Sequence, residues 1–242
     1  MAFPYDLLSV LLAFGISVSG AVLQGSVGFG LGLIGVPLLV LIDPVFVPGP
    51  LLLGAFLLNL LISSREKKAI DFKGVKWAIP GRVFGATLGA LMLNLVPKDH
   101  LSLLFGAMVL LAVGIAFAGL DFSPTSRNVL VAGTLSGFMG TTSAIGGAPM
   151  ALVFQKQKGS RIRGTLSMIF TIGTIISMAS LLVIGRFGIR EVQAASVLFP
   201  GIIVGFILSR HTARILDRGF IRAAVLITAA LSGMFVILKN FF

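Results

Sequence analysis

Two glycine-rich stretches, QGSVGFGLGLIGVP at residues 24–37 and GFMGTTSAIGGAP at residues 137–149, decide how this chain folds. Both interrupt long apolar runs, and glycine lets a backbone turn sharply or approach another group closely. A proline, Pro37 in the first stretch and Pro149 in the second, suits the first turn of a helix that restarts after the interruption. Each stretch therefore predicts a broken or re-entrant helix rather than a plain membrane span.

The two stretches read as copies of one another. An offset of 112 residues aligns Gly25 with Gly137, Gly28 with Gly140, Gly35 with Gly147 and Pro37 with Pro149. A second offset, of 120 residues, aligns Pro80-Gly81 with Pro200-Gly201 and Gly85 with Gly205. The chain is therefore predicted to be a duplication. Residues 1–120 and 121–242 form two transmembrane repeats of one integrated membrane domain.

The composition around these stretches requires a lipid environment. Of the 242 residues, 57% are hydrophobic and 11% are charged, whereas soluble domains carry about 25% charged residues. This excludes a cytosolic enzyme, a nucleic-acid binder and a disordered regulator. Because one crossing takes about 20 residues, we expect an all-α polytopic membrane protein with about 8 to 10 segments. These are residues 7–27, 28–42, 49–63, 75–96, 101–119, 128–142, 147–155, 164–184, 192–209 and 220–238.

Positive charges predict the orientation of these segments. The formal net charge is +11, and Lys and Arg gather in three loops at residues 65–76, 156–163 and 210–222. The positive-inside rule predicts that these loops are cytoplasmic. The loop at residues 43–50, which has no Lys or Arg, and both termini are then expected outside. Each half then holds an odd number of segments, five, so the repeats are inverted in the membrane. We expect a multi-pass protein of the cytoplasmic (inner) membrane.

Inverted repeats with interrupted segments at matching positions are typical of secondary transporters, whose substrate site lies where the repeats meet. Helices that restart there would direct unpaired N–H groups and positive dipole ends at an anion. The predicted substrate-binding residues are Gln24, Gly25, Ser26, Gly28, Asn59, Arg82, Gly140, Thr141, Thr142, Ser143, Gly146 and Gly147. The predicted hinge or helix-break residues are Gly35, Pro37 and Pro149. The alternative for the glycines is plain helix packing.

Two polar residues inside apolar segments, Arg82 and Asn59, each allow two interpretations. An arginine within a membrane segment is a functional candidate, and the planar fork of Arg82 suits a sulfonate as it suits a phosphate. Its counterpart in the second half is Ile202, so the scaffold does not need the charge. The alternative is that Arg82 reaches back to the cytoplasmic interface. The amide of Asn59 either joins helices or contacts substrate.

Several kinds of chemistry are not expected. The chain has no cysteine and two histidines, which are too few and too separate for a metal cluster. It has no nucleotide-binding loop, and no carboxylate falls deep in a segment. We therefore expect no cofactor, no metal and no catalysis, and the coupling ion stays open. The Gly85-x-x-x-Gly89 face suits either a homodimer or internal packing.

One further set of residues carries a family resemblance. The set consists of Gly25–Pro37 with PLLV at 37–40, SAIGGAPMAL at 143–152, PG at 80–81 and the basic loop after the third segment. On these the chain resembles the sulfite exporter TauE/SafE family of membrane permeases over nearly its whole length. Many relatives read SGIGGPP in the second stretch, where this chain has Ala144 and Ala148. The resemblance implies efflux or uptake of sulfite, sulfoacetate or another organosulfonate.

The leading hypothesis is a secondary transporter that exports a small sulfur-containing anion by alternating access. Its partners would be the small anionic substrate and the lipid bilayer, with a homodimer possible and no nucleic acid. The alternatives are an anion channel, an importer of the same anions and, less favoured, a non-transporting membrane subunit.

Overall fold

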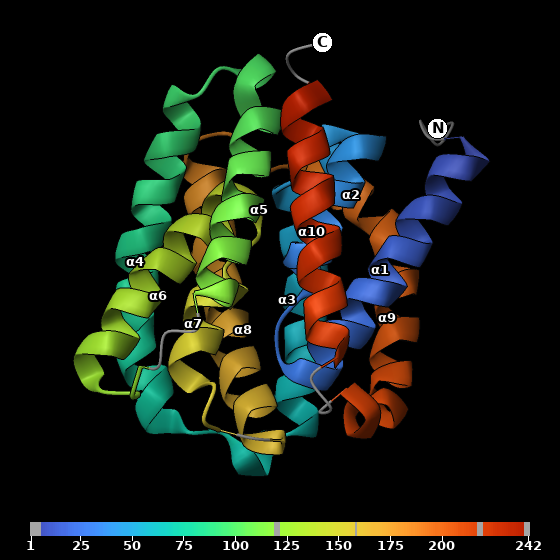
Figure 1. The fold of residues 1–242 in the computed structure, drawn as a ribbon. Coiled ribbons are helices and arrows are strands. Elements are labelled where there is room, and N and C mark those ends of the chain that lie inside the picture. The colour runs from blue at the N-terminus through green and yellow to red at the C-terminus, as the bar shows by residue number, and fades with distance from the viewer. Residues whose placement is uncertain (1–5, 119–121, 158, 217–219, 240–242) are drawn as a thin grey trace.

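All regular structure is helical in residues 6–118, 122–157, 159–216 and 220–239, which the computed structural model describes (Figure 1). The α-helices are α1 (Leu7–Val27), α2 (Leu31–Ile42), α3 (Gly49–Arg65), α4 (Phe72–Leu95), α5 (Leu101–Phe117), α6 (Ser126–Ser143), α7 (Gly147–Phe154), α8 (Ser160–Val183), α9 (Ile189–Leu216) and α10 (Phe220–Lys239). Short 3-10 turns are η1 (Pro44–Phe46), η2 (Lys67–Ala69) and η3 (Lys98–His100). The expected boundary between the two repeats, at residues 120 and 121, lies outside the described residues. The same holds for two of the loop charges, Lys158 and Arg218.

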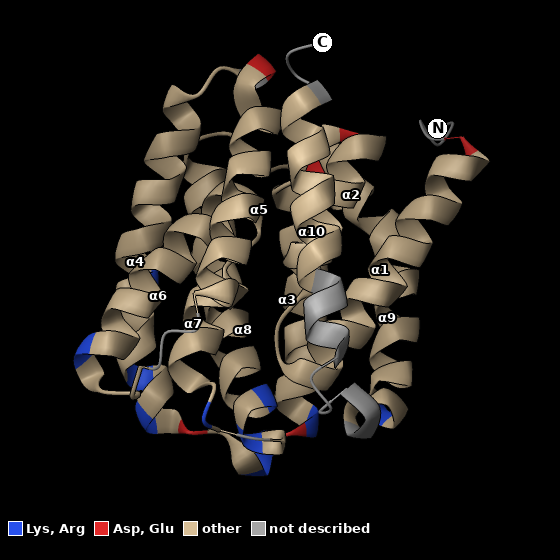
Figure 2. Cartoon of the chain, in the orientation of Figure 1, with Lys and Arg blue, Asp and Glu red and all other residues tan. Residues whose placement is uncertain are grey.

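The helices form a bundle whose two ends differ in charge. The start of α1 and the end of α10 lie at one end (Figure 1). Most of the Lys and Arg residues visible in Figure 2 lie at the other end, around the connections from α3 to α4 and from α7 to α8. We call this second end the basic end. The loop charges predict that it faces the cytoplasm, and that side assignment stays a prediction.

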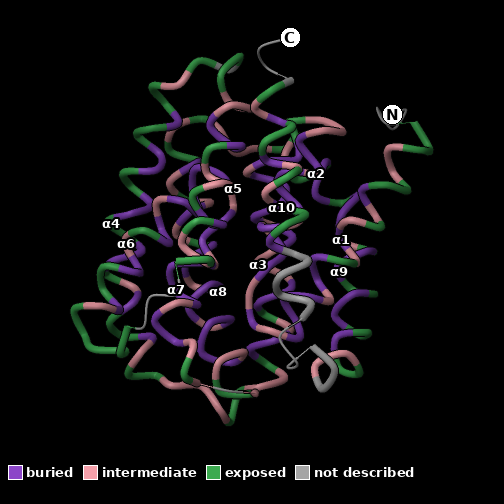
Figure 3. Tube along the Cα trace, viewed as in Figure 1, coloured by how far each residue is buried: buried purple, intermediate pink, exposed green. Residues whose placement is uncertain are grey.

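The outer surface of the bundle is apolar enough for lipid. Four helices, α1, α4, α8 and the first 25 residues of α9, are long and apolar enough to cross a membrane. Exposed residues lie along the outside of the bundle (Figure 3), and large apolar side chains are among them: Leu95 is 80% exposed and Val183 is 86% exposed. The chain is thus an all-helical, multi-pass membrane protein, as its composition predicts.

Both predicted helix breaks are present. Two glycines with positive φ, Gly28 at 100° and Gly30 at 131°, turn the chain between α1 and α2. The chain turns between α6 and α7 at Ala144, which has a φ of 61° and is the one non-glycine residue with positive φ in the described part. Its Cβ makes this conformation cost about 1–2 kcal/mol, a cost that a glycine at the same position would avoid.

The prediction that both prolines lie in a first helical turn is correct for one of them. Pro149 is the third residue of α7, but Pro37 is the seventh residue of α2 and Gly35 the fifth. The first half restarts its helix early because Gly28 and Gly30 complete the turn before the chain reaches Pro37. Pro37 therefore removes a backbone hydrogen bond from the interior of α2.

Two glycine-lined helix pairs hold the bundle together: α4 packs closely on α6, and α9 packs closely on α1. A methyl group at Gly85 would overlap the carbonyl oxygen of Thr134, and one at Gly205 would lie 2.5 Å from the carbonyl oxygen of Val18. These glycines occupy corresponding positions in the two halves, as a duplication would give, although the inversion of the repeats stays a prediction. The Gly85-x-x-x-Gly89 face is used inside the chain, since a methyl group at Gly89 would also press on α6.

We expect Gly85→Ala to destabilise the protein, because its Cβ would force α4 away from the α6 backbone. Overpacking of this kind costs about 1–3 kcal/mol. Gly114→Ala on α5 is the matched control, since a methyl group there meets nothing within 4 Å. Thermal unfolding of the purified variants measures the difference. Equal melting temperatures for the two variants would show that the close contact between α4 and α6 does not support the fold.

Candidate functional site

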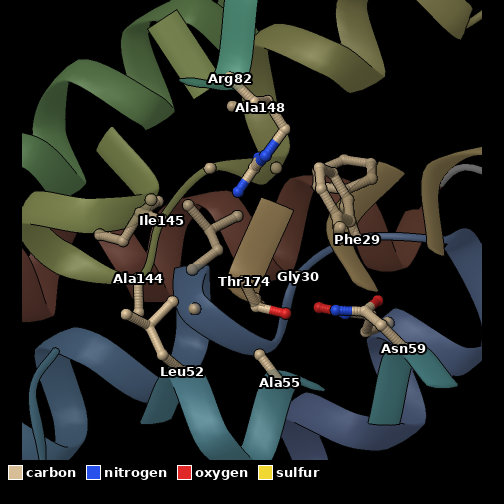
Figure 4. A pocket seen from close by; sticks show the side chains of 17 residues that line it. Phe29, Gly30, Leu52, Ala55, Asn59, Arg82, Ala144, Ile145, Ala148 and Thr174 are labelled. Atoms are coloured by element: carbon tan, nitrogen blue, oxygen red, sulfur yellow. The ribbon is translucent and has the colours of Figure 1, made fainter. Parts of the chain in front are cut away.

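A small cavity lies where the two helix breaks meet. Its volume is about 40 Å³, and Figure 4 shows ten of its lining residues with labels. The lining comprises Gln24, Phe29, Gly30, Gly32, Leu33, Leu52, Ala55, Asn59, Arg82, Gly140, Ala144, Ile145, Gly146, Gly147, Ala148, Phe170 and Thr174. Residues from both halves of the chain therefore build one site.

The two breaks touch one another directly. A methyl group at Gly32 would overlap the carbonyl oxygen of Ala144, and one at Gly147 would lie 3.0 Å from Cβ of Phe29. The first turns of α2 and α7 consequently both border the cavity. A helix start offers N–H groups without intrahelical partners and a partial positive charge. The backbone alone makes this cavity attractive to an anion.

Arg82 supplies a full positive charge to the cavity. It is the eleventh of the 24 residues of α4 and is 2% exposed, so it does not reach back to the interface. Its Nη1 donates to Oγ of Ser136 at 2.7 Å, and its guanidinium carbon lies 5.6 Å from the centre of the Phe170 ring. Its buried Nε has no hydrogen-bond partner in the described structure, and none of the ion pairs found among the described residues involves Arg82.

Glycines make the space that the guanidinium occupies. A methyl group at Gly140 would lie 3.4 Å from Nη2 of Arg82, and one at Gly146 would lie 3.3 Å from Nη1. A methyl group at Gly173 on α8 would overlap the guanidinium itself. The Ser136 hydroxyl that accepts from Arg82 donates in turn to the carbonyl oxygen of Gly146. The arginine is thus held against the second break, while its Nε has no hydrogen-bond partner in the described structure.

An amide pair borders the opposite part of the cavity. Oε1 of Gln24 accepts from the N–H of Leu31 at 3.0 Å, at the start of α2. Nε2 of Gln24 donates to Oδ1 of Asn59 on α3 at 2.8 Å. Asn59 and Thr174 point toward the same part of the cavity (Figure 4). The hydroxyl of Thr174 donates to the carbonyl oxygen of Thr171 at 3.0 Å. Gln24 therefore fixes the first break, and Asn59 is the residue of this group whose amide suits a ligand.

The structure brings together half of the predicted binding residues. Gln24, Asn59, Arg82, Gly140, Gly146 and Gly147 line the cavity, whereas Gly25, Ser26, Gly28, Thr141, Thr142 and Ser143 do not. The hydroxyls of Thr142 and Ser143 donate to backbone carbonyls of their own helix, the common habit of such side chains inside helices. The hydroxyl of Thr141 donates to Oγ of Ser177 at 2.8 Å. These three hydroxyls join protein to protein and are not directed at a ligand.

Several residues at the cavity carry no signal in the sequence. Phe29 and Gly30 lie inside the first quoted stretch but were not singled out, and Phe170 and Gly173 lie in the apolar run of α8. A phenylalanine or a lone glycine in a membrane helix carries no signal of its own. Gly173 becomes informative only when Arg82 is known to lie against it.

A cluster of charges closes the basic end beside the first break. Arg65 ends α3, and its Nη2 donates to the carbonyl oxygen of Gly25 at 2.6 Å. Oε1 of Glu66 accepts from Nε of Arg65 and from Nε of Arg163, at 3.1 Å each. Nη1 of Arg163 also donates to the carbonyl oxygen of Ser26 at 3.4 Å. Arg65 from α3 and Arg163 from α8 thereby both hold the end of α1, and the carboxylate of Glu66 joins the two arginines to one another. We call Arg65, Glu66 and Arg163 the closing cluster.

A second carboxylate at the basic end fixes the start of α4. Oδ1 of Asp71 accepts from the N–H groups of Lys73 and Gly74, and its Oδ2 accepts from Arg161 at 3.2 Å. Burial raises the pKa of Asp71, but the hydrogen bonds from Gly74 and Arg161 outweigh it and hold that pKa below its usual value. This carboxylate is therefore ionised at neutral pH and joins the start of α4 to the first turn of α8.

The chain matches a protein-family model over most of its length. The model described as Sulfite exporter TauE/SafE matches residues 12–236, which contain the cavity, both helix breaks and the closing cluster. No curated protein and no solved structure matched the chain.

We expect Arg82→Gln to abolish anion binding, because it removes the one full charge that the described residues present to the cavity. Arg127→Gln is the matched control, since Arg127 is exposed at the start of α6. The measurement is the shift in melting temperature that sulfite causes. A ligand at a hundredfold excess over its dissociation constant stabilises the native state by about 2.7 kcal/mol. An equal sulfite-induced shift in both variants would remove Arg82 from the site.

Proposed function

The chain belongs to the sulfite exporter TauE/SafE family of membrane transporters, and on that basis we propose that it exports a small sulfur-containing anion across the cytoplasmic membrane. Sulfite is the leading substrate, with organosulfonates such as sulfoacetate next. The proposed mechanism is alternating access around the cavity between the two helix breaks.

The observation that carries this proposal is the guanidinium of Arg82, buried beside two helix starts and without a carboxylate partner among the described residues. The planar fork of arginine matches the geometry of an oxyanion. An anion held there would accept from the guanidinium, whose Nη1 is shared with Ser136 and whose Nε has no protein partner in the described structure. The phenyl rings of Phe29 and Phe170 border the same cavity and would shield the ion pair from water.

The size of the cavity favours a small anion. One water molecule needs about 10–15 Å³ of such volume, so the volume of about 40 Å³ corresponds to roughly three waters. An ion of three or four heavy atoms, such as sulfite, matches that space. A longer organosulfonate would need the two breaks to move apart, and this supports sulfite over sulfoacetate.

The closing cluster supports an alternating-access mechanism. It joins α1 and α3 of the first half to α8 of the second half, and Asn59 precedes Arg65 by six residues on α3, about 9 Å along the helix axis. Parting of Arg163 from Glu66 would therefore open a route between the basic end and the cavity. The positive field of the basic end would raise the local concentration of anions there.

The proposal is tested by the flux of labelled sulfite into proteoliposomes that hold the purified protein and are filled with unlabelled sulfite. We expect saturable uptake of labelled sulfite by the wild type and by Arg127→Gln, and none by Arg82→Gln. Large ohmic currents with no saturation would identify a channel instead. Absence of flux from the wild type would support a non-transporting membrane subunit and contradict the proposal.

We expect Glu66→Gln to loosen the basic end, because it leaves the guanidinium groups of Arg65 and Arg163 without the charge that joins them. The chain has no cysteine, so a single cysteine at Ala55, which lines the cavity, reports on access. A membrane-impermeant maleimide supplied from the basic side should label Ala55→Cys several-fold faster in the Glu66→Gln background.

The matched control is Glu191→Gln near the start of α9, at the opposite end of the bundle, where Glu191 accepts from the N–H of Gly188. It should leave the labelling rate from the basic side unchanged. Equal rates in the Glu66→Gln and wild-type backgrounds would show that the closing cluster does not restrict access to the cavity.

A further inference from the structure

We propose that the protein is an obligatory anion exchanger: the binding site passes from one side of the membrane to the other only while it holds an anion. This rests on the proposed function, since it concerns the same cavity. It adds that export of one anion requires a second anion to return. Neither the family match nor the sequence assigns this mode of coupling.

The acidic groups of the described chain lie away from the middle of the helices. The described Asp and Glu residues lie at helix ends or in connections: Asp6 caps α1, Asp43 follows α2, Glu66 follows α3, Asp71 caps α4, Asp99 lies in η3 and Glu191 lies in the first turn of α9. Asp121 and Asp217 lie outside the described residues. No described carboxylate therefore lies in the interior of a helix, where Arg82 is.

The surroundings of Arg82 leave its charge uncompensated. It contacts one hydroxyl, the Phe170 ring and the glycines that make its space. None of these groups carries a negative charge, and the buried Nε has no partner in the described structure. Arginine keeps its proton in proteins, so the side chain cannot become neutral when water leaves the cavity.

Alternating access includes a state in which the site is closed to both sides. In that state an empty site leaves the guanidinium buried without a counter-ion, and burial of an unpaired charge is strongly unfavourable. An anion on Arg82 forms a charge-assisted pair and offsets that cost. The loaded carrier therefore crosses the closed state faster than the empty carrier, and the bound anion serves as the missing counter-charge.

The experiment uses the wild-type protein in proteoliposomes, with labelled sulfite outside. One set of vesicles contains unlabelled sulfite, and the matched set contains only gluconate, which is too large for the cavity. We expect uptake to be at least about tenfold faster into the sulfite-filled vesicles. A tenfold difference in rate corresponds to about 1.4 kcal/mol in the barrier.

The outcomes separate the inference from the function on which it rests. Equally fast uptake into both sets of vesicles would overturn the exchange proposal and leave sulfite transport standing. No uptake into either set would overturn both. Uptake only into sulfite-filled vesicles, lost in Arg82→Gln and kept in Arg127→Gln, would support exchange through Arg82.

A second readout uses the membrane potential. Exchange of one sulfite for another moves no net charge, so a potassium diffusion potential set with valinomycin should leave the exchange rate unchanged. Movement of sulfite alone would carry charge and respond to the potential. A several-fold change in the wild-type rate with potential would contradict exchange.

Discussion

One buried positive charge constrains the rest of this structure. Arg82 lies mid-helix in a chain that offers it no carboxylate among the described residues, and such a charge is tolerable only where polar groups and a counter-ion can reach it. The hydroxyl of Ser136, which accepts from the guanidinium, meets the first need in part, whereas the two helix starts add positive potential. A bound anion would meet the second. The stability of the site and its affinity for anions therefore have the same origin.

The helix packing explains how that charge is held in place. Close contact between α4 and α6 brings Arg82 beside Ser136 and the second break, and this contact depends on glycines that let the two backbones approach. The corresponding contact between α9 and α1 supports the first break, where Gln24 fixes the start of α2. Both breaks then meet at one cavity. Movement of the α1–α9 pair against the α4–α6 pair would change access to the cavity without dismantling either close pair.

The sequence predicted those features that depend on local chemistry. Paired glycine-rich stretches predicted both breaks, and an arginine with no counterpart in the second half predicted the charged group. Prediction from the sequence failed where contacts between distant parts of the chain decide the structure. The place of Pro37 depended on how soon Gly28 and Gly30 complete the turn, and Gly173 has meaning only through its contact with Arg82. From the sequence, Arg65 and Arg163 were predicted only to be loop charges. Their shared contact with Glu66 could not be predicted, because it joins residues far apart in the chain.

The central claim is that a small oxyanion binds to Arg82 between the two helix breaks. The most direct measurement is anomalous scattering from crystals of the wild-type protein soaked in selenite, the selenium analogue of sulfite. The account predicts a selenium peak in the cavity, within about 4.5 Å of the Arg82 guanidinium nitrogens, as hydrogen bonds to its oxygens require. A selenium peak at the closing cluster with none in the cavity would contradict it.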